Sequence, residues 1–190
     1  MEEIILASAS PRRSQLLSLI GVPFQVIVSD ADESVEAEQP EEIVMELAYR
    51  KAHAVAILPE AAGKFVLGAD TIVWCDGRML GKPKDAAEAG AMLQVLQGRE
   101  HSVYTGVALL RDDAVKRFYR QTKVFVHEMS QEEIDAYIAT GDPFDKAGAY
   151  GIQGPFAAYV DGIEGDYQTV VGLPVSAVYQ MLKETGYAAG

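Results

Sequence analysis

The first thirty residues follow a pattern of strand, helix and strand. An apolar run at 4–7 gives way to small polar residues and then to a helical spacing of apolar side chains over 11–20. Ser10 can cap this helix with its hydroxyl, and Pro11 suits the first helical position, where no backbone donor is lost. The pattern therefore predicts a buried strand, a tight turn and a helix, with a second strand at 24–29.

The remainder of the chain mixes helical and extended patterns without a regular alternation. The predicted helices are 40–58, 85–98, 130–141 and a last one from Pro174 to about Thr185. The predicted strands are 65–75 with a short return at 79–80, a long antiparallel pair at 102–110 and 115–127, and a short strand near 157–160 before the glycine-rich stretch 161–166. Because paired antiparallel runs lie between the helices, the pattern predicts an α/β fold with a mixed sheet flanked by helices.

The composition narrows the class of protein. With 190 residues, 49% of them apolar and 23% charged, the chain fits a single domain over 1–190. A formal net charge of −12 argues against nucleic acids and anionic membranes as partners, because both bind to a positive field. The single Cys75 allows neither an internal disulfide nor a cysteine metal site, so we expect a reducing interior, the cytoplasm. No apolar run approaches the ~20 residues of a membrane helix.

Two arginines follow the predicted start of the first helix. Arg12 and Arg13 stand in the first turn, where the helix dipole disfavours cations. Free N–H groups at a helix N-terminus and two guanidinium groups together favour an anion with several oxygens, so this segment indicates a phosphate site. Ser8 and Ser10 are interpreted as phosphate or cap partners. The alternative is an ordinary capped helix with two solvated arginines.

Carboxylates occur where strands end or where burial is costly. Asp30, Asp32 and Glu33 follow the second strand and are candidate metal ligands, although loops are often simply acidic. Asp70 lies within an apolar strand, where a carboxylate is costly to bury unless a metal or hydrogen bonds compensate it. We therefore favour a metal ligand or a general base at Asp70 over a structural aspartate.

Basic residues recur next to these carboxylates. Lys51 falls on the apolar stripe of its helix and is therefore expected to point inward. Its ammonium group either lies near a phosphate or reaches the surface by snorkelling. Lys82 and Lys84 lie on a short loop before a capped helix, as further phosphate contacts or as solvated lysines. The stretch 142–154 is rich in glycine and alanine and carries Gln153, a composition that lets backbone approach a ligand closely, although it could be an irregular surface loop.

Several familiar sites are missing from the sequence. No G-x-x-x-x-G-K-[ST] segment is present and no G-x-G-x-x-G follows a strand, so a Walker-type nucleotidase is not expected. The three histidines, His53, His101 and His127, have no zinc spacing and are interpreted as structural or surface residues. No Ser-His-Asp or Cys-His arrangement is legible either.

Taken together, the motifs resemble the Maf family, the septum formation inhibitor relatives of the inosine triphosphate pyrophosphatases. They occur in the family's order and cover nearly the whole chain: LASASPRRSQLL, Asp32-Glu33, the helix segment 48–52, GADTIV, GKPKDAAEA, HSVYTGVAL, DKAGAYGIQG and VVGLP. The combination is far more specific than any one motif. Gln168-Thr169 before VVGLP departs from the Tyr-Asn or Ser-Asn expected there, which leaves that wall of the pocket open.

The resemblance implies a fold and a reaction. The fold is an inosine triphosphate pyrophosphatase-like, strongly twisted mixed sheet flanked by helices, with two lobes around a cleft. The reaction converts a nucleoside triphosphate and water into the monophosphate and pyrophosphate, with Mg²⁺ or Mn²⁺. By this resemblance, Asp70 would be the general base and would lie next to the metal. Glu33 would be a carboxylate ligand of the metal. The residues that would bind substrate phosphates are Ser8, Arg12, Arg13, Lys51 and Lys82.

The same resemblance points to a branch of the family. The chain resembles the members that act on dTTP, UTP and modified pyrimidine triphosphates such as 5-methyl-UTP. The residues that carry this resemblance are Arg12, Thr71, Lys82 and Gln153. A glutamine amide offers both a donor and an acceptor, which matches the uracil edge. The alternatives are the sibling branch acting on 7-methyl-GTP, which we expect to lack Gln153, and a non-catalytic nucleotide-binding regulator of septum formation. A homodimer is expected by family likeness alone.

Overall fold

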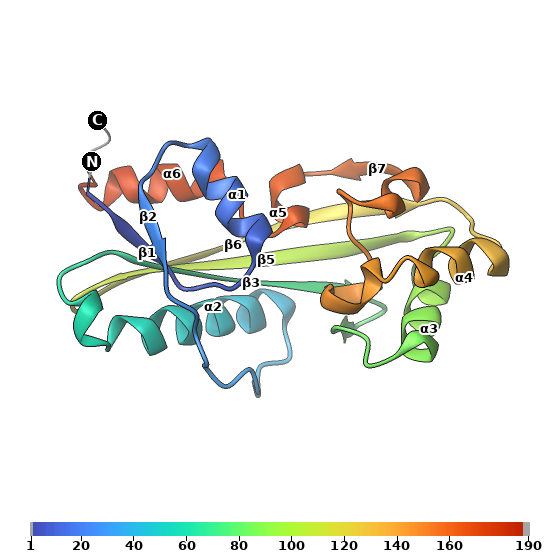
Figure 1. Ribbon diagram of the computed structural model, residues 1–190, viewed down its shortest axis with the longest axis horizontal. Helices are drawn as coiled ribbons and strands as arrows, with labels where there is room; N and C mark the ends of the chain where they lie inside the picture. The colour runs from blue at the N-terminus through green and yellow to red at the C-terminus, as the bar shows by residue number, and fades with distance from the viewer. Residues whose placement is uncertain (1, 188–190) are drawn as a thin grey trace. The chain divides into compact units, whose positions relative to one another are not determined.

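The computed structural model describes residues 2–187, whose strands form a seven-stranded sheet in the order β2-β1-β3-β5-β6-β7, with β4 paired to β3 (Figure 1). The strands are β1 (Ile4–Leu6), β2 (Phe24–Val26), β3 (Val66–Cys75), β4 (Arg78–Leu80), β5 (Glu100–Arg111), β6 (Ala114–Val126) and β7 (Val160–Glu164). Parallel and antiparallel pairs occur in one sheet, so the predicted mixed α/β architecture is confirmed.

Helices connect these strands, and each α-helix except α5 corresponds to a predicted one. The α-helices are α1 (Pro11–Leu19), α2 (Pro40–Ala56), α3 (Ala86–Leu96), α4 (Gln131–Ala139), α5 (Tyr167–Val171) and α6 (Val175–Glu184). Short 3-10 helices are η1 (Pro59–Ala61), η2 (Asp142–Asp145), η3 (Ala147–Ala149) and η4 (Pro155–Tyr159). Within the described part of the chain, none of the helices combines the length and apolarity needed to cross a membrane.

The chain divides into two compact units, which are described separately. Unit 1 comprises Met1–Asp70, Thr105–Arg120 and Gly172–Gly190, and unit 2 comprises Thr71–Tyr104 and Gln121–Val171. The long strands β3, β5 and β6 each contribute residues to both units.

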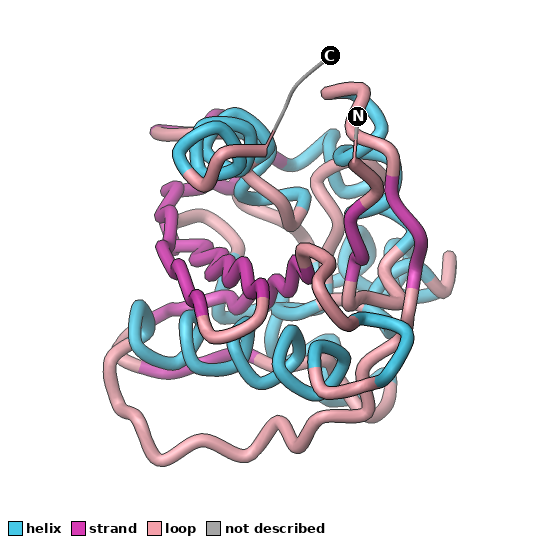
Figure 2. The backbone as a smooth tube through the Cα atoms, turned by 90° about the vertical axis from the view of Figure 1, so that its left-hand side faces the viewer, coloured by secondary structure: helices cyan, strands magenta, loops and turns pink. Residues whose placement is uncertain are grey.

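Unit 1 begins with three parallel strands. β1 pairs with β2 through Ile4 and Phe24, and with β3 through Ile5 and Val66. The helices α1 and α2 are the crossovers between these strands, and crossovers between parallel strands are almost always right-handed. The chain moves in one direction across the sheet from β1 to β2 and in the opposite direction from β2 to β3. Two right-handed crossovers in opposite directions cover opposite faces, with α2 on one face and α1 and α6 on the other (Figures 1 and 2).

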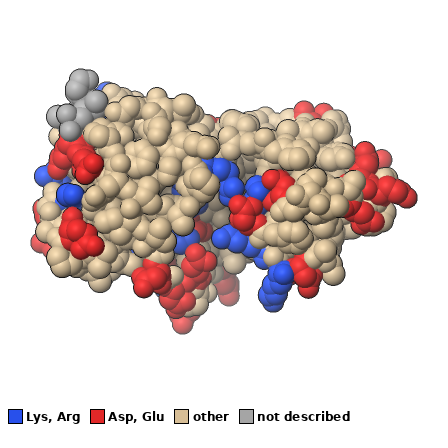
Figure 3. All heavy atoms as spheres, in the orientation of Figure 1, with Lys and Arg blue, Asp and Glu red and all other residues tan. Residues whose placement is uncertain are grey.

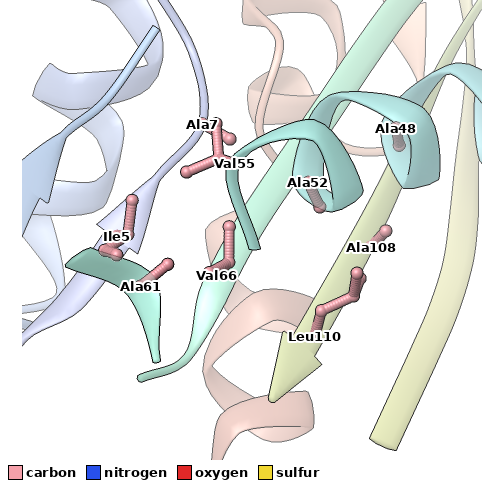
Figure 4. Packing of buried hydrophobic residues seen from close by; sticks show 9 residues of the cluster. All are labelled: Ile5, Ala7, Ala48, Ala52, Val55, Ala61, Val66, Ala108 and Leu110. Atoms are coloured by element: carbon pink, nitrogen blue, oxygen red, sulfur yellow. The ribbon is translucent and has the colours of Figure 1, made fainter. Parts of the chain in front are cut away.

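Helix α2 sits unusually close to the sheet of unit 1. Figure 4 shows its inner face, which carries small side chains, against the apolar side chains of β1, β3 and β5. A Cβ atom added at Gly68 of β3 would lie 2.9 Å from the Cβ of Ala52, and one added at Gly106 of β5 would overlap the backbone of α2 at Val44. Glycine is required at these two positions because any Cβ atom there would collide with α2. The distance of α2 from β3 and β5 is therefore set by backbone contact at these two positions.

Unit 2 contains a hairpin and an aromatic core. β3 and β4 pair antiparallel through Val73 and Leu80, and the turn between them, Asp76-Gly77, has positive φ angles of 50° and 72° at its two residues. Such angles belong to the tight hairpin turn that Asp-Gly favours. Phe156 is fully buried and packs against a ring of tyrosines, Tyr137, Tyr150 and Tyr159, with ring centroids 5.2, 4.6 and 5.7 Å away.

One stretch of unit 2 was predicted wrongly. The strand predicted near 157–160 is instead the 3-10 helix η4, and strand β7 follows it in the stretch taken to be a glycine-rich loop. Pro155 starts the 3-10 helix, and burial of Phe156 in the aromatic core holds it there. β7 exists because it pairs antiparallel with β6, where Gly162 faces Phe125. This pairing partner lies too far along the chain to affect the local pattern.

Candidate active site

The start of α1 fixes Arg13 before any ligand is present. Ser10 caps the helix as predicted, because its hydroxyl accepts a hydrogen bond from the Arg13 N–H at 3.5 Å. The Arg13 side chain donates from Nε to the Gly172 carbonyl at 2.8 Å and from Nη1 to the Ser8 hydroxyl at 3.3 Å. Ser8 is 6% exposed and also accepts from the Ser10 N–H at 3.2 Å. Two of the guanidinium's donors are thus used to orient it.

A lysine and two carboxylates meet in the same unit. The Lys51 ammonium lies 2.5 Å from Asp70 Oδ1 and 2.8 Å from Glu33 Oε1. The Lys51 and Asp70 side chains are 16% and 11% exposed, whereas that of Glu33 is 65% exposed. Lys51 points inward, as predicted, and its charge compensates the buried carboxylate of Asp70, which would otherwise be costly. The cluster therefore has a closed side at Asp70 and an open side at Glu33.

The arginine and the carboxylates lie within reach of each other's field. Burial lowers the pKa of Arg13, and the positive charge of Arg12 acts in the same direction. Asp70 and Glu33 oppose this by favouring the charged guanidinium. A guanidinium titrates so far above neutrality that Arg13 stays positive. Ser8, Arg13, Glu33, Lys51 and Asp70 therefore form one electrostatic neighbourhood in unit 1, to which Arg12, half-buried beside Arg13, contributes a further positive charge.

The carboxylate pair fits a divalent metal of the type that the family resemblance implies. Glu33 and Asp70 place hard oxygen donors around one point that a cation, the Lys51 ammonium, occupies in this structure. Mg²⁺ is bound in proteins by one or two carboxylates together with waters and substrate phosphates. Groups of three or more histidine, cysteine, aspartate or glutamate side chains that could hold a metal are absent from residues 2–187. A pair is sufficient when phosphate supplies the other oxygens.

The other carboxylates after β2 have different surroundings. Asp32 accepts from the backbone N–H and the hydroxyl of Ser34 at 2.9 and 2.6 Å, and these hydrogen bonds lower its pKa. Figure 3 shows acidic side chains gathered over this loop, below α2. A cavity of about 1040 Å³ beside the loop is lined mainly by charged residues, among them Asp32, Glu36, Glu42, Glu46, Arg50 and Arg117. With four acids against two arginines, this cavity repels a polyanion, and neither Lys51 nor Asp70 lines it.

Three predicted site residues, Thr71, Lys82 and Gln153, belong to unit 2. Thr71 is half-buried on β3, next to Asp70 in the chain, and Lys82 and Gln153 are exposed on loops. The Gly148 N–H donates to the Gly81 carbonyl at 3.0 Å, which joins the Lys82 loop to the segment that leads to Gln153. Unit 2 thus brings together two loops that are far apart in sequence.

Sequence reasoning missed two sets of residues around these candidates. The Gly172 carbonyl orients Arg13 although it lies 159 positions further along the chain. In unit 2, the two missed residues are Tyr137 and Asp142, which form a hydrogen-bonded network with Lys146 beneath the Gln153 loop. The composition of 142–154 was the available signal for the network, and the VVGLP motif was the signal for Gly172.

The architecture is that of a known class of α/β proteins with a mixed sheet. The Staphylococcus aureus Ham1 protein has the same fold, with a TM-score of 0.56 at 16% identity over 97% of this chain and 100% of that chain. The family model of Maf-like proteins matches residues 3–185, and the chain belongs to the Maf family.

Similar proteins of the Maf family bear a functional name. The chain is 55% identical over 185 residues to a dTTP/UTP pyrophosphatase of Bacillus cytotoxicus, covering 97% of this chain and 96% of that protein. It is 53% identical over 185 residues to a protein of the same name from Bacillus cereus and 52% identical to one from Bacillus thuringiensis, with the same coverage. The identification of the Maf family from the motifs is confirmed.

Proposed function

We propose that this chain is a nucleoside triphosphate pyrophosphatase that hydrolyses dTTP and UTP, and modified pyrimidine triphosphates, to the monophosphate and pyrophosphate. Relatives that bear this name share more than half of its residues over nearly the full length. The observation that carries the proposal is the Lys51 ammonium held at 2.5 and 2.8 Å from Asp70 and Glu33. We propose that residues 1–190 act as a single catalytic domain.

A divalent cation, Mg²⁺ or Mn²⁺, is the proposed cofactor, held by Glu33 and Asp70. Bound there, it would neutralise phosphate charge and lower the pKa of a water molecule. Lys51 contacts both carboxylates and therefore competes with such a cation for them. In the nucleotide complex, the Lys51 ammonium has the phosphate oxygens as an alternative partner.

Asp70 is the proposed general base. Its carboxylate accepts the proton of a water molecule whose oxygen attacks the α-phosphorus. The new bond joins the water oxygen to the α-phosphorus, and the bond between the α-phosphorus and the bridging oxygen to the β-phosphorus breaks. Pyrophosphate leaves with that oxygen and its electron pair. Asp70 is 8% exposed, so the proton acceptor lies in a largely dry environment.

The cations of the site are proposed to bind the phosphate chain. Arg13 is held rigidly by Ser8 and the Gly172 carbonyl, so it needs no reorganisation when the charge of the transition state develops. Arg12 at the start of α1 adds a second guanidinium at the positive end of the helix dipole. Lys51 and Lys82 are each proposed to supply an ammonium group to phosphate oxygens. Losing one electrostatic contact of this kind costs about 10²–10³ in rate.

Gln153 and Thr71 are proposed to set the base preference. A glutamine amide can donate to a uracil carbonyl and accept from its N3–H, a pairing available from thymine as well. A base without that edge leaves the amide unpaired, which is how a polar site rejects a wrong substrate. Gln153 is exposed on its loop and therefore available to a ligand.

Substitution of the proposed base tests the reaction. The variant Asp70→Asn should lose turnover of UTP and dTTP by about 10²–10³ or more while remaining folded, because the amide cannot accept the water proton. The matched control is Glu36→Gln, an exposed acid on the loop that carries Glu33. Its turnover should equal that of the wild type. Wild-type turnover in Asp70→Asn would show that the base is assigned wrongly.

Analysis of the products separates the remaining functions. Incubation of the protein with UTP, dTTP and 7-methyl-GTP in Mg²⁺ should give the monophosphate and pyrophosphate from the two pyrimidine nucleotides. Preference for 7-methyl-GTP would place the chain in the sibling branch. Release of a diphosphate and phosphate would identify another phosphohydrolase, and no product would leave a nucleotide-binding regulator. We also propose a homodimer, from family likeness, which light scattering in solution tests.

A further inference from the structure

Gln153 lies in a turn between Gly151 and Gly154, and both glycines pack closely against other side chains. A hydrogen bond from the Gly154 N–H to the Gly151 carbonyl, 3.2 Å long, closes a turn around Gln153. A Cβ added at Gly151 would lie 2.6 Å from Lys146 Cε, and one added at Gly154 would lie 3.0 Å from Asp142 Oδ2. The turn thus rests directly on the side chains of Lys146 and Asp142.

Those side chains belong to a hydrogen-bonded network centred on Asp142. The Tyr137 hydroxyl donates to Asp142 Oδ2 at 2.6 Å and accepts from the Gly151 N–H at 3.3 Å. The Lys146 ammonium lies 3.1 Å from Asp142 Oδ1, donates to the Asp142 carbonyl at 2.6 Å, and donates to Asp145 Oδ1 at 2.6 Å. The network therefore ties the end of α4 to the beginning of the turn.

The network is buried enough to be rigid. Tyr137 is 3% exposed and packs its ring on Phe156, and the Lys146 and Asp142 side chains are 14% and 22% exposed. Burial and the neighbouring Asp142 carboxylate both raise the pKa of Tyr137, so its hydroxyl keeps the proton that it donates. Gln153, in contrast, is exposed. A buried support carries a side chain that faces a ligand.

We infer that Tyr137 is a positioning residue for base recognition, which holds the Gln153 turn through Asp142 and the Gly151 N–H. This inference rests on the proposed function, because it takes Gln153 as the residue that reads the base. Recognition groups must be held within about 0.5 Å of their productive position, and supporting side chains supply that accuracy. Loss of the Tyr137 hydroxyl should therefore weaken discrimination between bases while leaving the cleavage chemistry intact.

The test compares UTP with CTP, which differ in the hydrogen-bonding edge of the base. Tyr137→Phe removes one oxygen and keeps the ring packed on Phe156. We expect the ratio of kcat/KM for UTP to that for CTP to fall about 3- to 10-fold, the range for one hydrogen bond of ordinary strength, mainly through KM for UTP. The matched control is Tyr159→Phe, because Tyr159 packs on the same Phe156 ring at 5.7 Å. Its ratio should equal that of the wild type.

A double-substitution cycle shows whether the effect passes through Gln153. In the Gln153→Ala background, Tyr137→Phe should change the ratio by less than about 2-fold, because the residue that it positions is gone. An equal fall in both backgrounds overturns the inference. Asp142→Asn is the second variant, because it keeps an acceptor for Tyr137 and removes the charge that faces Lys146. Its ratio should also fall, and thermal unfolding should show both variants folded at the assay temperature.

Failure of the inference and of the proposed function are distinguishable. If Gln153→Ala lowers the ratio and both Tyr137→Phe and Asp142→Asn match the wild type, the inference is wrong and the proposed function stands. If Gln153→Ala itself leaves the ratio unchanged, the base-reading role of Gln153 is wrong and the inference falls with it. Absence of turnover of both nucleotides by the wild type overturns the proposed function itself.

Discussion

Acidification should destabilise the protein through one buried histidine. His101 is 4% exposed, and its Nε2 atom lies 2.7 Å from the Tyr150 hydroxyl. Burial lowers the pKa of His101 from 6.5 to about 4, and the positive charge of Arg99 acts in the same direction. Its Nδ1 atom has no hydrogen-bond partner among the described residues, so a proton added there would have no acceptor.

The sign and size of the effect follow from proton linkage. Between about pH 4 and 6.5 the unfolded chain binds a proton at His101 and the folded protein does not, so stability falls as the pH falls through this window. A shift of this size amounts to about 3 kcal/mol below pH 4, of which about 2 kcal/mol is lost between pH 7 and pH 5.

Urea unfolding at pH 7 and pH 5, followed by circular dichroism, measures this loss. We expect the wild type to lose about 2 kcal/mol more over this interval than His101→Gln, whose amide does not titrate. His127→Gln is the matched control, because the His127 side chain is 55% exposed, and it should behave as the wild type does. If His101→Gln loses as much stability as the wild type, burial does not suppress protonation of His101.

Two further predictions concern α2. Replacing Lys51 by methionine removes the cation that lies between Asp70 and Glu33. In the absence of nucleotide, Mg²⁺ at about ten times the Kd of the variant should raise the Tm of the variant by about 4 °C. The same Mg²⁺ concentration should raise the Tm of the wild type by less. Equal shifts in scanning fluorimetry would contradict the competition. Gly106→Ala should cost about 3 kcal/mol in urea unfolding, because its Cβ overlaps the backbone of α2. Gly90→Ala, where the nearest atom within reach is 3.6 Å away, should stabilise α3 by about 0.5–1 kcal/mol, and similar losses in both would refute the steric argument.

The elements that could be predicted from the sequence are those that depend on close neighbours in the chain. The serine and aspartate caps of α1, α3 and α4 each accept a hydrogen bond from a backbone N–H three residues further on, as their sequence patterns predict. The Asp76-Gly77 turn is equally local, because the two residues themselves tolerate the positive φ angles that it requires. Such signals are legible because the interacting groups are four or fewer positions apart.

The contacts that complete the candidate site are legible only in space. Lys51 was predicted to point inward, but its two carboxylate partners lie 18 and 19 positions away on different elements. The Gly172 carbonyl that orients Arg13 comes from the far end of the chain, and a backbone acceptor has no residue type by which it could be recognised. The network under Gln153 escaped for a related reason. Tyr137 is a buried residue of α4, and the partners of its hydroxyl, Asp142 and the Gly151 N–H, are brought beside it only by the fold.

The glycines of the sheet and the lysine of the site are parts of one arrangement. Because Gly68 and Gly106 admit the backbone of α2 against β3 and β5, the helix cannot shift without losing contact along both strands. Lys51 is therefore held close enough to Asp70 for a 2.5 Å contact, which compensates a carboxylate in an otherwise apolar strand. A side chain at either glycine would push α2 outward and leave Asp70 buried without Lys51 as its partner. Residues with no functional group of their own thus decide whether this strand can carry a charged one.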